Sequence, residues 1–143
     1  MAIYYYEEEV SAKLTQKRSL SKFLQGLVLQ HLVIKKLRLN YIFCDDGYLL
    51  EKNQQFLNHN TLTDIITFDL SEHDDELQGE IYISVDRVRE NANKFAADYN
   101  TELHRVIFHG TLHLCGYKDK KKADKELMTQ MENDCLQKYF TQK

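Results

Sequence analysis

Along the chain, short stretches of strand-like composition or alternating apolar residues are interspersed with stretches in which apolar residues recur at helical spacing. This succession predicts a mixed α/β fold. Residues 3–6 have the β-branched and aromatic composition of a short strand, and residues 37–44 alternate between apolar and polar positions. Residues 65–68 and 80–84 are two further strand candidates, separated by the acidic stretch 71–78. The pattern therefore indicates about four strands.

Apolar residues at helical spacing predict about five helices between and after these strands. The expected helices run from Ser19 or Ser21 to about residue 33, from Asp45 or Asp46 to about residue 57, over residues 85–98, from Asn100 or Thr101 to about residue 115, and over about residues 123–140. Their inner faces are expected to include Val88, Phe95 and Ala96 in the third helix, and Leu127, Met131, Cys135 and Leu136 in the last. We therefore expect an α/β (α+β) fold in which residues 1–143 form a single domain, with a roughly four-stranded mixed sheet packed against the helices.

Composition and charge restrict the classes of function. Hydrophobic residues make up 43% of the 143 residues and charged residues 29%, as in ordinary soluble proteins. The formal net charge of −3 gives no overall basic footprint, so a nucleic-acid surface would be a local patch. Three widely spaced cysteines argue against a disulfide framework, and the first residues lack the pattern of a signal peptide. We expect a cytoplasmic protein with reduced, mostly buried thiols.

The strongest candidate chemistry lies in residues 109–119, which read HGTLHLCGYKD. His109 and His113 are four residues apart, so on a helix their rings share one face and can converge on one ion. Gly116 permits the backbone conformation that ends a helix, which lets the chain turn and bring Asp119 to the same point. Three protein ligands with a fourth position for water are typical of a catalytic zinc site.

A structural role is the alternative for these residues. In that case His109 and His113 are satisfied histidines of a core helix, and Asp119 only caps the last helix. The predicted helix is apolar nearly all round, however, so buried histidines on it need partners, and a shared metal would supply one to both rings. Cys115 and His104 lie at angles around the helix that exclude them from a site shared with His109 and His113. The metal site thus rests on two histidines, with Asp119 as the third and least certain ligand.

The residue after the first histidine separates classes of metalloenzyme. Zinc proteases of the H-E-x-x-H type use that glutamate as a general base, and here the position is Gly110. The remaining candidate chemistry is attack by water that the metal activates. Gly110 is also costly within a helix, by about 1 kcal/mol relative to alanine, which indicates a close approach by another group.

A run of lysines follows the motif and is the candidate phosphate-binding patch. Lys118, Lys120 and Lys121 lie next to the predicted metal, at a helix N-terminus where positive charge is unfavourable. Such a position makes sense if the lysines hold the phosphates of a nucleic acid. The simpler interpretation is a solvated start of the last helix.

The motif resembles the signature of the YbeY-type endoribonuclease family. Residues 62–68 (LTDIITF) are similar to that family's T-D strand, residues 78–84 (QGEIYIS) to its G-D/E-I-x-I-S strand, and Asn53 fits its L-x-x-x-N helix. The resemblance implies a single-strand-specific, metal-dependent endoribonuclease that matures the 3′ end of small-subunit ribosomal RNA and acts in ribosome quality control. The implied partners are ribosomal RNA and the ribosome or its proteins, with no membrane. The implied ligands of one zinc or similar ion are His109, His113 and the position of Asp119.

Two departures from the family pattern matter. Asp119 stands where the family has a third histidine, so the identity of the metal is open. The family's basic residue upstream of the T-D strand corresponds to Leu57, with Asn58 and His59 nearby. Two other functions remain open: a non-catalytic ribosome-assembly protein with a structural metal, and a metal-dependent hydrolase of another substrate.

Overall fold

The computed structural model describes residues 1–57 and 63–142, except for the side chains of residues 56 and 57; Asn58 and His59 lie outside this range. The elements in chain order are β1 (Ala2–Glu7), α1 (Lys17–His31), β2 (Lys36–Cys44), α2 (Asp46–Leu57), β3 (Ile65–Asp69), β4 (Glu76–Ser84), α3 (Val85–Lys94), α4 (Tyr99–Leu114) and α5 (Lys122–Thr141). Among the described residues none of the helices is both long enough and apolar enough to cross a membrane.

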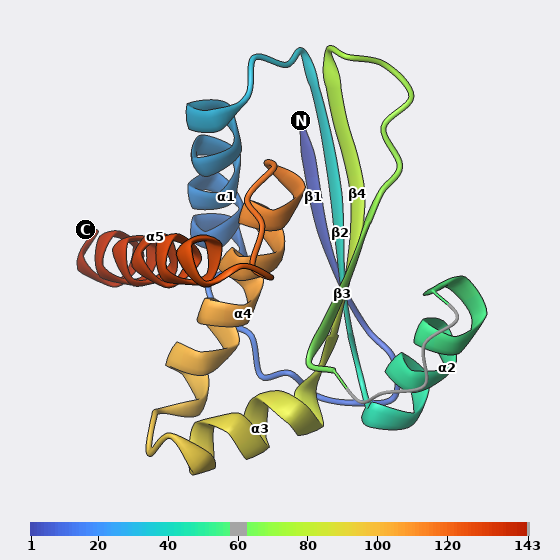
Figure 1. The fold of residues 1–143 in the computed structure, drawn as a ribbon, viewed down its shortest axis with the longest axis vertical. Helices are drawn as coiled ribbons and strands as arrows, with labels where there is room; N and C mark the ends of the chain where they lie inside the picture. The colour runs from blue at the N-terminus through green and yellow to red at the C-terminus, as the bar shows by residue number, and fades with distance from the viewer. Residues whose placement is uncertain (58–62, 143) are drawn as a thin grey trace.

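The four strands form one mixed sheet in the order β1-β2-β4-β3. β1, β2 and β4 run parallel, whereas β3 pairs antiparallel with β4. Figure 1 shows the sheet nearly edge-on, with α1, α4 and α5 on one side and α2 on the other. The predicted fold class, a four-stranded mixed sheet with five helices, is confirmed.

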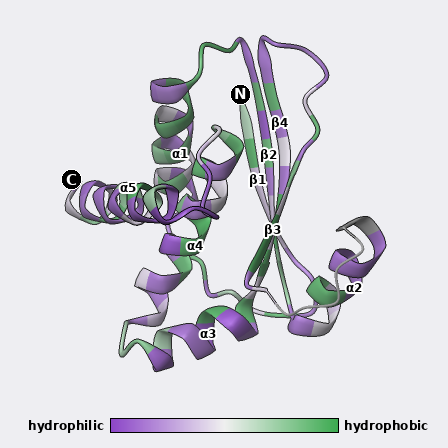
Figure 2. Cartoon of the chain, viewed as in Figure 1, coloured by the Kyte–Doolittle hydropathy of each residue, from purple (hydrophilic) through white to green (hydrophobic). Residues whose placement is uncertain are grey.

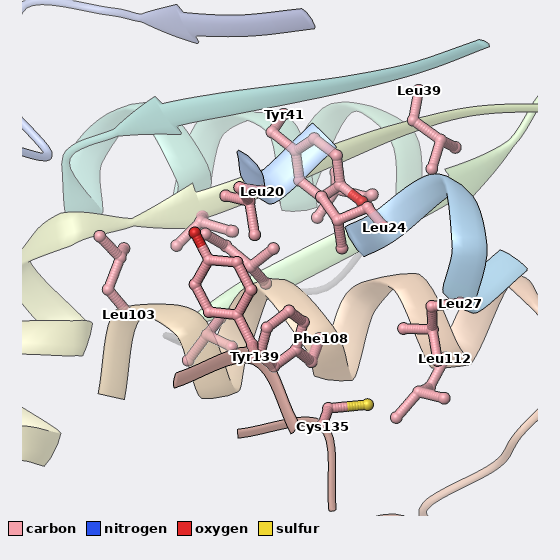
Figure 3. Packing of buried hydrophobic residues seen from close by; sticks show 14 of the residues in the cluster. Leu20, Leu24, Leu27, Leu39, Tyr41, Leu103, Phe108, Leu112, Cys135 and Tyr139 are labelled. Carbon is pink, nitrogen blue, oxygen red and sulfur yellow. The ribbon is translucent and has the colours of Figure 1, made fainter. Parts of the chain in front are cut away.

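The main core lies between the sheet and the three helices α1, α4 and α5. In Figure 2, α1 alternates between hydrophobic and hydrophilic residues along its turns, whereas α3 is largely hydrophilic. Figure 3 shows the inward-facing side chains of the main core, which come from α1, α4, α5 and β2: Leu20, Leu24, Leu27, Leu39, Tyr41, Leu103, Phe108, Leu112, Cys135 and Tyr139. A smaller cluster under α2 comprises Ile42, Cys44, Leu49, Ile66 and Tyr82. The cysteines are free, and Cys44 and Cys135 are buried, as expected.

Several predicted element ends were wrong. α1 begins at Lys17, before both serines predicted to cap it, and Gln16 at its N-cap makes no side-chain cap hydrogen bond. α4 begins at Tyr99 because Asp98 is its cap: the Asp98 carboxylate accepts the backbone N–H of Thr101 at 3.2 Å. Polar residues near a helix start all resemble caps in sequence, and only the backbone path selects one.

The start of β4, the end of α3 and the buried face of α5 also differ from the predictions. β4 begins at Glu76, four residues before the predicted start, since Lys36–Asn40 of β2 provides ladder partners for Glu76–Glu80. α3 ends at Lys94, which leaves Phe95 exposed and Ala96 in the left-handed region at φ 52°. On α5, Leu127 is exposed, and Met128 lies on the buried face instead. The predicted cap of α2 is correct, because Asp45 Oδ1 accepts the N–H of Tyr48 at 2.8 Å.

Gly110 marks the closest approach between α4 and the sheet. A Cβ built at this position would lie 2.7 Å from Ile65 Cδ1 and 2.9 Å from Ile81 Cγ2. The expected close approach at Gly110 is therefore made by the sheet. A side chain here would push α4, and with it His109 and His113, away from β3 and β4.

Gly110→Ala is expected to destabilise the protein by up to about 2 kcal/mol, because overpacking costs about 1–3 kcal/mol against a gain of about 1 kcal/mol in helix propensity. Gly26→Ala on α1 is the matched control, since its Cβ would meet nothing within 4 Å. That control should stabilise the protein by up to about 1 kcal/mol. Urea denaturation of both variants provides the comparison, and two shifts of the same sign would contradict it.

Candidate metal centre

His109 and His113 present their rings side by side on one face of α4, with ring centroids 5.6 Å apart. The helix ends directly after them: Tyr117 N–H donates to Leu112 O at 3.1 Å, and Gly116 adopts φ 108°, a conformation that favours glycine. The chain then turns back toward α4. The structure thereby brings together the residues that the sequence placed in one site.

Asp119 lies opposite the two rings, at the end of this turn. Its Oδ2 is 3.1 Å from His109 Nε2, and its Oδ1 is 3.9 Å from His113 Nε2. α5 begins at Lys122 with Lys121 at the N-cap and no side-chain cap hydrogen bond, so Asp119 does not cap this helix. The alternative explanation for an aspartate at this position is therefore wrong, and its carboxylate faces the two imidazoles.

The second nitrogen of each ring is held by an acceptor. His109 Nδ1 is 2.5 Å from Glu132 Oε2, and His113 Nδ1 is 2.6 Å from the carbonyl oxygen of Tyr117. A carboxylate and a carbonyl only accept, so both Nδ1 atoms carry the proton. In neutral rings, the lone pairs are then at Nε2, toward Asp119. Metal-ligating histidines have the same arrangement, with the outer N–H bound to a carboxylate or carbonyl.

Glu132 was missed by the sequence analysis, which predicted only apolar residues on the inner face of α5. It is 7% exposed and lies one turn from Met128 and one turn from Leu136 on the buried face of that helix. A carboxylate on a buried stripe needs a partner. This break in the stripe at a spacing of four residues was the available signal, and the partners are His109 and Arg105, whose Nη1 is 3.2 Å from Glu132 Oε1.

The donor set fits a divalent ion. Two imidazole nitrogens and a carboxylate suit zinc, and ligand atoms in a tetrahedral zinc site lie about 3.3 Å apart. The observed separations of 3.1 and 3.9 Å bracket that value. Among the described residues, no group of three or more histidine, cysteine or acidic side chains is placed to hold a metal ion as it stands, so His109, His113 and Asp119 are not a preformed metal shell.

Electrostatics favours a positive charge at this point. Burial by itself lowers the pKa of His109, but the hydrogen bond to Glu132 and the charges of Glu132, Asp119 and Asp64 outweigh burial and raise this pKa above its usual value. Burial also raises the pKa of Asp64, which His109 partly counteracts. A proton on His109 Nε2 and a metal ion would compete for the same position. Acidity should therefore weaken metal binding here.

His109, His113 and Asp119 line a cleft of about 660 Å³, within the size range of small-molecule sites. β3, α3, α4, α5 and α2 contribute its walls, and the remaining lining residues include Asn53, Thr63, Asp64, Ile65, Ile66, Thr67, Asn91, Phe95, Glu102, Arg105, Val106 and Glu132. The side chains of His113 and Asp119 are 35% and 34% exposed, so solvent reaches the site. Asp64, whose role the motif left open, belongs to this wall.

The predicted lysine patch lies beside the cleft. Lys118, Lys120 and Lys121 are exposed on the loop between α4 and α5 and are not among the described lining residues. Arg105 lies inside instead, within 3.9 Å of Glu102 and 3.2 Å of Glu132. The structure therefore places the three lysines outside the described lining of the cleft, next in sequence to Asp119.

His104, His31 and Cys115 stand apart from the two rings. His104 Nδ1 donates to Asn100 O at 2.7 Å, and its ring stacks on Tyr139, so it faces away as expected. His31 contacts the Tyr117 ring edge-on. Cys115 contacts the main core.

Comparison with known proteins gives one consistent result. A family model described as endoribonuclease YbeY matches residues 3–140. Endoribonuclease YbeY of Parabacteroides distasonis is 44% identical over 136 residues, which cover 95% of this chain and 94% of the relative. The corresponding protein of Flavobacterium psychrophilum is 60% identical over 98 residues, 68% of this chain and 69% of the relative. The solution structure of a Thermotoga maritima protein has a TM-score of 0.68 at 30% identity, covering 96% of this chain and 89% of that one.

Proposed function

Because the chain belongs to the YbeY endoribonuclease family, we propose that it cleaves single-stranded ribosomal RNA with the help of one divalent metal ion, zinc being the first candidate. Its role would be maturation of the 3′ end of small-subunit ribosomal RNA and ribosome quality control in the cytoplasm, with the ribosome or its proteins as partners. The observation that carries metal dependence is the convergence of His109, His113 and Asp119, with both Nδ1 protons already engaged.

His109 Nε2, His113 Nε2 and the Asp119 carboxylate would hold the ion. When bound, a divalent ion lowers the pKa of a coordinated water and polarises a phosphoryl oxygen, which is the chemistry that hydrolysis of a phosphodiester needs. Glu132 keeps the proton of His109 on Nδ1 and fixes the plane of that ring. Arg105, held by Glu102 and Glu132, provides a positive charge in the wall of the cleft.

The open cleft favours a catalytic metal over a structural one. Structural zinc sites are closed by four protein ligands, whereas three protein groups meet here among the described residues, at the wall of a cleft. The exposed lysines beside it favour a polyanionic substrate over a small neutral one. A purely structural metal in a ribosome-assembly protein would need a fourth protein ligand.

The direct test is cleavage of a single-stranded ribosomal RNA fragment by the purified protein. Cleavage should stop when a chelator removes the metal and return when zinc or manganese is added. The same sequence annealed into a duplex should be cut much more slowly. Metal-independent cleavage, or equal cleavage of both substrates, would contradict the proposal.

The lysine loop should contribute mainly through phosphates. The triple substitution of Lys118, Lys120 and Lys121 by glutamine should weaken RNA binding for all sequences alike. It should reduce the slope of log affinity against log salt by up to about 2, since each contact to a single strand contributes about 0.7. Glutamines at Lys17, Lys22 and Lys35, three exposed lysines elsewhere, are the matched control. If the slope is unchanged in the first variant, Lys118, Lys120 and Lys121 do not contact the phosphates of RNA and are only solvated surface residues.

A further inference from the structure

Phe95 is a large apolar side chain exposed at the wall of the catalytic cleft. It is 66% exposed, and it lines the same cleft as His109, His113 and Asp119. Helical periodicity predicts it on the inner face of α3, but that helix ends one residue earlier. An exposed phenylalanine gains little from the hydrophobic effect in the free protein, so its position calls for another reason.

The turn that presents Phe95 is well defined. Phe95 N–H donates to Asn91 O at 3.0 Å, and Ala97 N–H donates to Ala92 O at 2.8 Å, which closes the end of α3. Between them Ala96 adopts φ 52°, where glycine is the usual residue and other residues carry strain of order 1 kcal/mol. The ring is therefore held by a fixed backbone and does not hang from a loose loop.

The surroundings of the ring match those of a nucleobase site. Lys94 Nζ lies 5.6 Å from the ring centroid, where it can pair with a phosphate next to a stacked base. Asn91 and Thr67 in the same cleft offer hydrogen-bonding groups for base edges. An aromatic ring with a neighbouring cation is the usual platform on which single-stranded nucleic acids stack.

We propose that Phe95 stacks on a base of the single-stranded RNA substrate close to the scissile phosphate. This inference rests on the proposed function and adds a reason for single-strand selectivity. A base in a duplex has both faces covered by its neighbours, so only an unpaired base can lie on the ring. The stacked base would then hold the single strand in the cleft that His109, His113 and Asp119 line.

The test combines the removal of the Phe95 ring with the removal of single bases from the RNA, as in a double-mutant cycle. Binding of a labelled single-stranded oligoribonucleotide is measured by fluorescence anisotropy with chelator present, so that nothing is cleaved, for the parent protein and for Phe95→Ala. The oligonucleotide is used intact and with single abasic positions scanned around the cleavage point. Phe95→Ala should bind the intact strand about 5- to 100-fold more weakly. At one abasic position the parent should fall to the same affinity, and the variant should lose little more.

Kinetics with metal present separate substrate binding from the chemical step. KM should rise in Phe95→Ala with kcat within about twofold of the parent, and Phe95→Trp should restore KM. Tyr4→Ala is the matched control: Tyr4 is 43% exposed with Arg38 5.4 Å from its ring, but it lies on β1, three strands away from β3 in the sheet. The control should bind like the parent.

The outcomes distinguish this inference from the function on which it rests. If the parent binds and cleaves RNA while Phe95→Ala does the same with unchanged affinity, the stacking role is wrong and the proposed function stands. An equal loss for intact and for every abasic strand also overturns stacking. If the parent neither binds nor cleaves RNA, both proposals fail together.

Discussion

Replacement of both His109 and His113 by alanine is expected to reduce metal-dependent RNA cleavage by at least about 10³-fold. The reason is that the two Nε2 atoms are two of the three donors that meet in the cleft. A metal contributes several kcal/mol of transition-state stabilisation, and each 1.36 kcal/mol corresponds to a factor of ten in rate. Asp119 alone would not retain the ion. Zinc binding, measured by isothermal titration calorimetry, should be lost as well.

The matched control is His73→Ala, because His73 is an exposed histidine between β3 and β4 and is not part of the cleft. It should cleave RNA and bind zinc like the parent. All proteins must be purified identically, since a contaminating ribonuclease would act equally in every preparation. Cleavage by the double variant at the parent's rate would remove the two histidines from the mechanism.

Glu132→Gln is expected to weaken metal affinity and cleavage by about 10- to 100-fold, the usual effect of losing the hydrogen-bond partner of a ligating histidine. The substitution keeps the size of the side chain but removes the charge that holds the proton on His109 Nδ1. The amide can present either an acceptor or a donor to the ring, so the tautomer with a free Nε2 is no longer enforced. Arg105 keeps Glu102 as its second carboxylate.

Nitrogen NMR of the metal-free protein gives a readout that does not depend on activity. At a pH above the raised pKa of His109, where the ring is neutral, the His109 resonances of the parent should report a proton held on Nδ1, whereas those of Glu132→Gln should report a mixture of tautomers. Glu126→Gln, an exposed glutamate on the same helix, is the control and should leave the spectrum and zinc affinity unchanged. Thermal denaturation shows whether the variant folds. If Glu132→Gln keeps the zinc affinity and the His109 resonances of the parent, Glu132 does not position the His109 proton and serves only as the ion-pair partner of Arg105.

Local spacing explains why the residues of the candidate metal centre could be named from the sequence. His109 and His113 are neighbours because any helix places residues four apart on one face, and the glycine at residue 116 returns the chain within a few residues. Asp119 follows within the same short segment. These relations are set within one short segment, so they do not depend on how the rest of the chain folds.

The groups around the centre could not be placed by spacing. Glu132 comes from α5, and Asp64 precedes β3, so both are brought to His109 by the packing of separate elements. The exposure of Phe95 depends on where α3 stops, and helical periodicity predicted the opposite. Charge patterns likewise indicated the lysines, whereas the cationic side chain among the described residues that line the cleft is Arg105.

The sequence by itself determined the element types, the fold class and the pair of histidines, because hydrophobic period and i,i+4 spacing are properties of a short stretch of chain. Only the tertiary structure decided which acceptors hold the histidine protons and which aromatic ring borders the cleft. Those contacts join residues far apart in the chain, and their geometry depends on packing distances such as the close approach of α4 to the sheet at Gly110. Patterns along a chain do not encode such distances residue by residue.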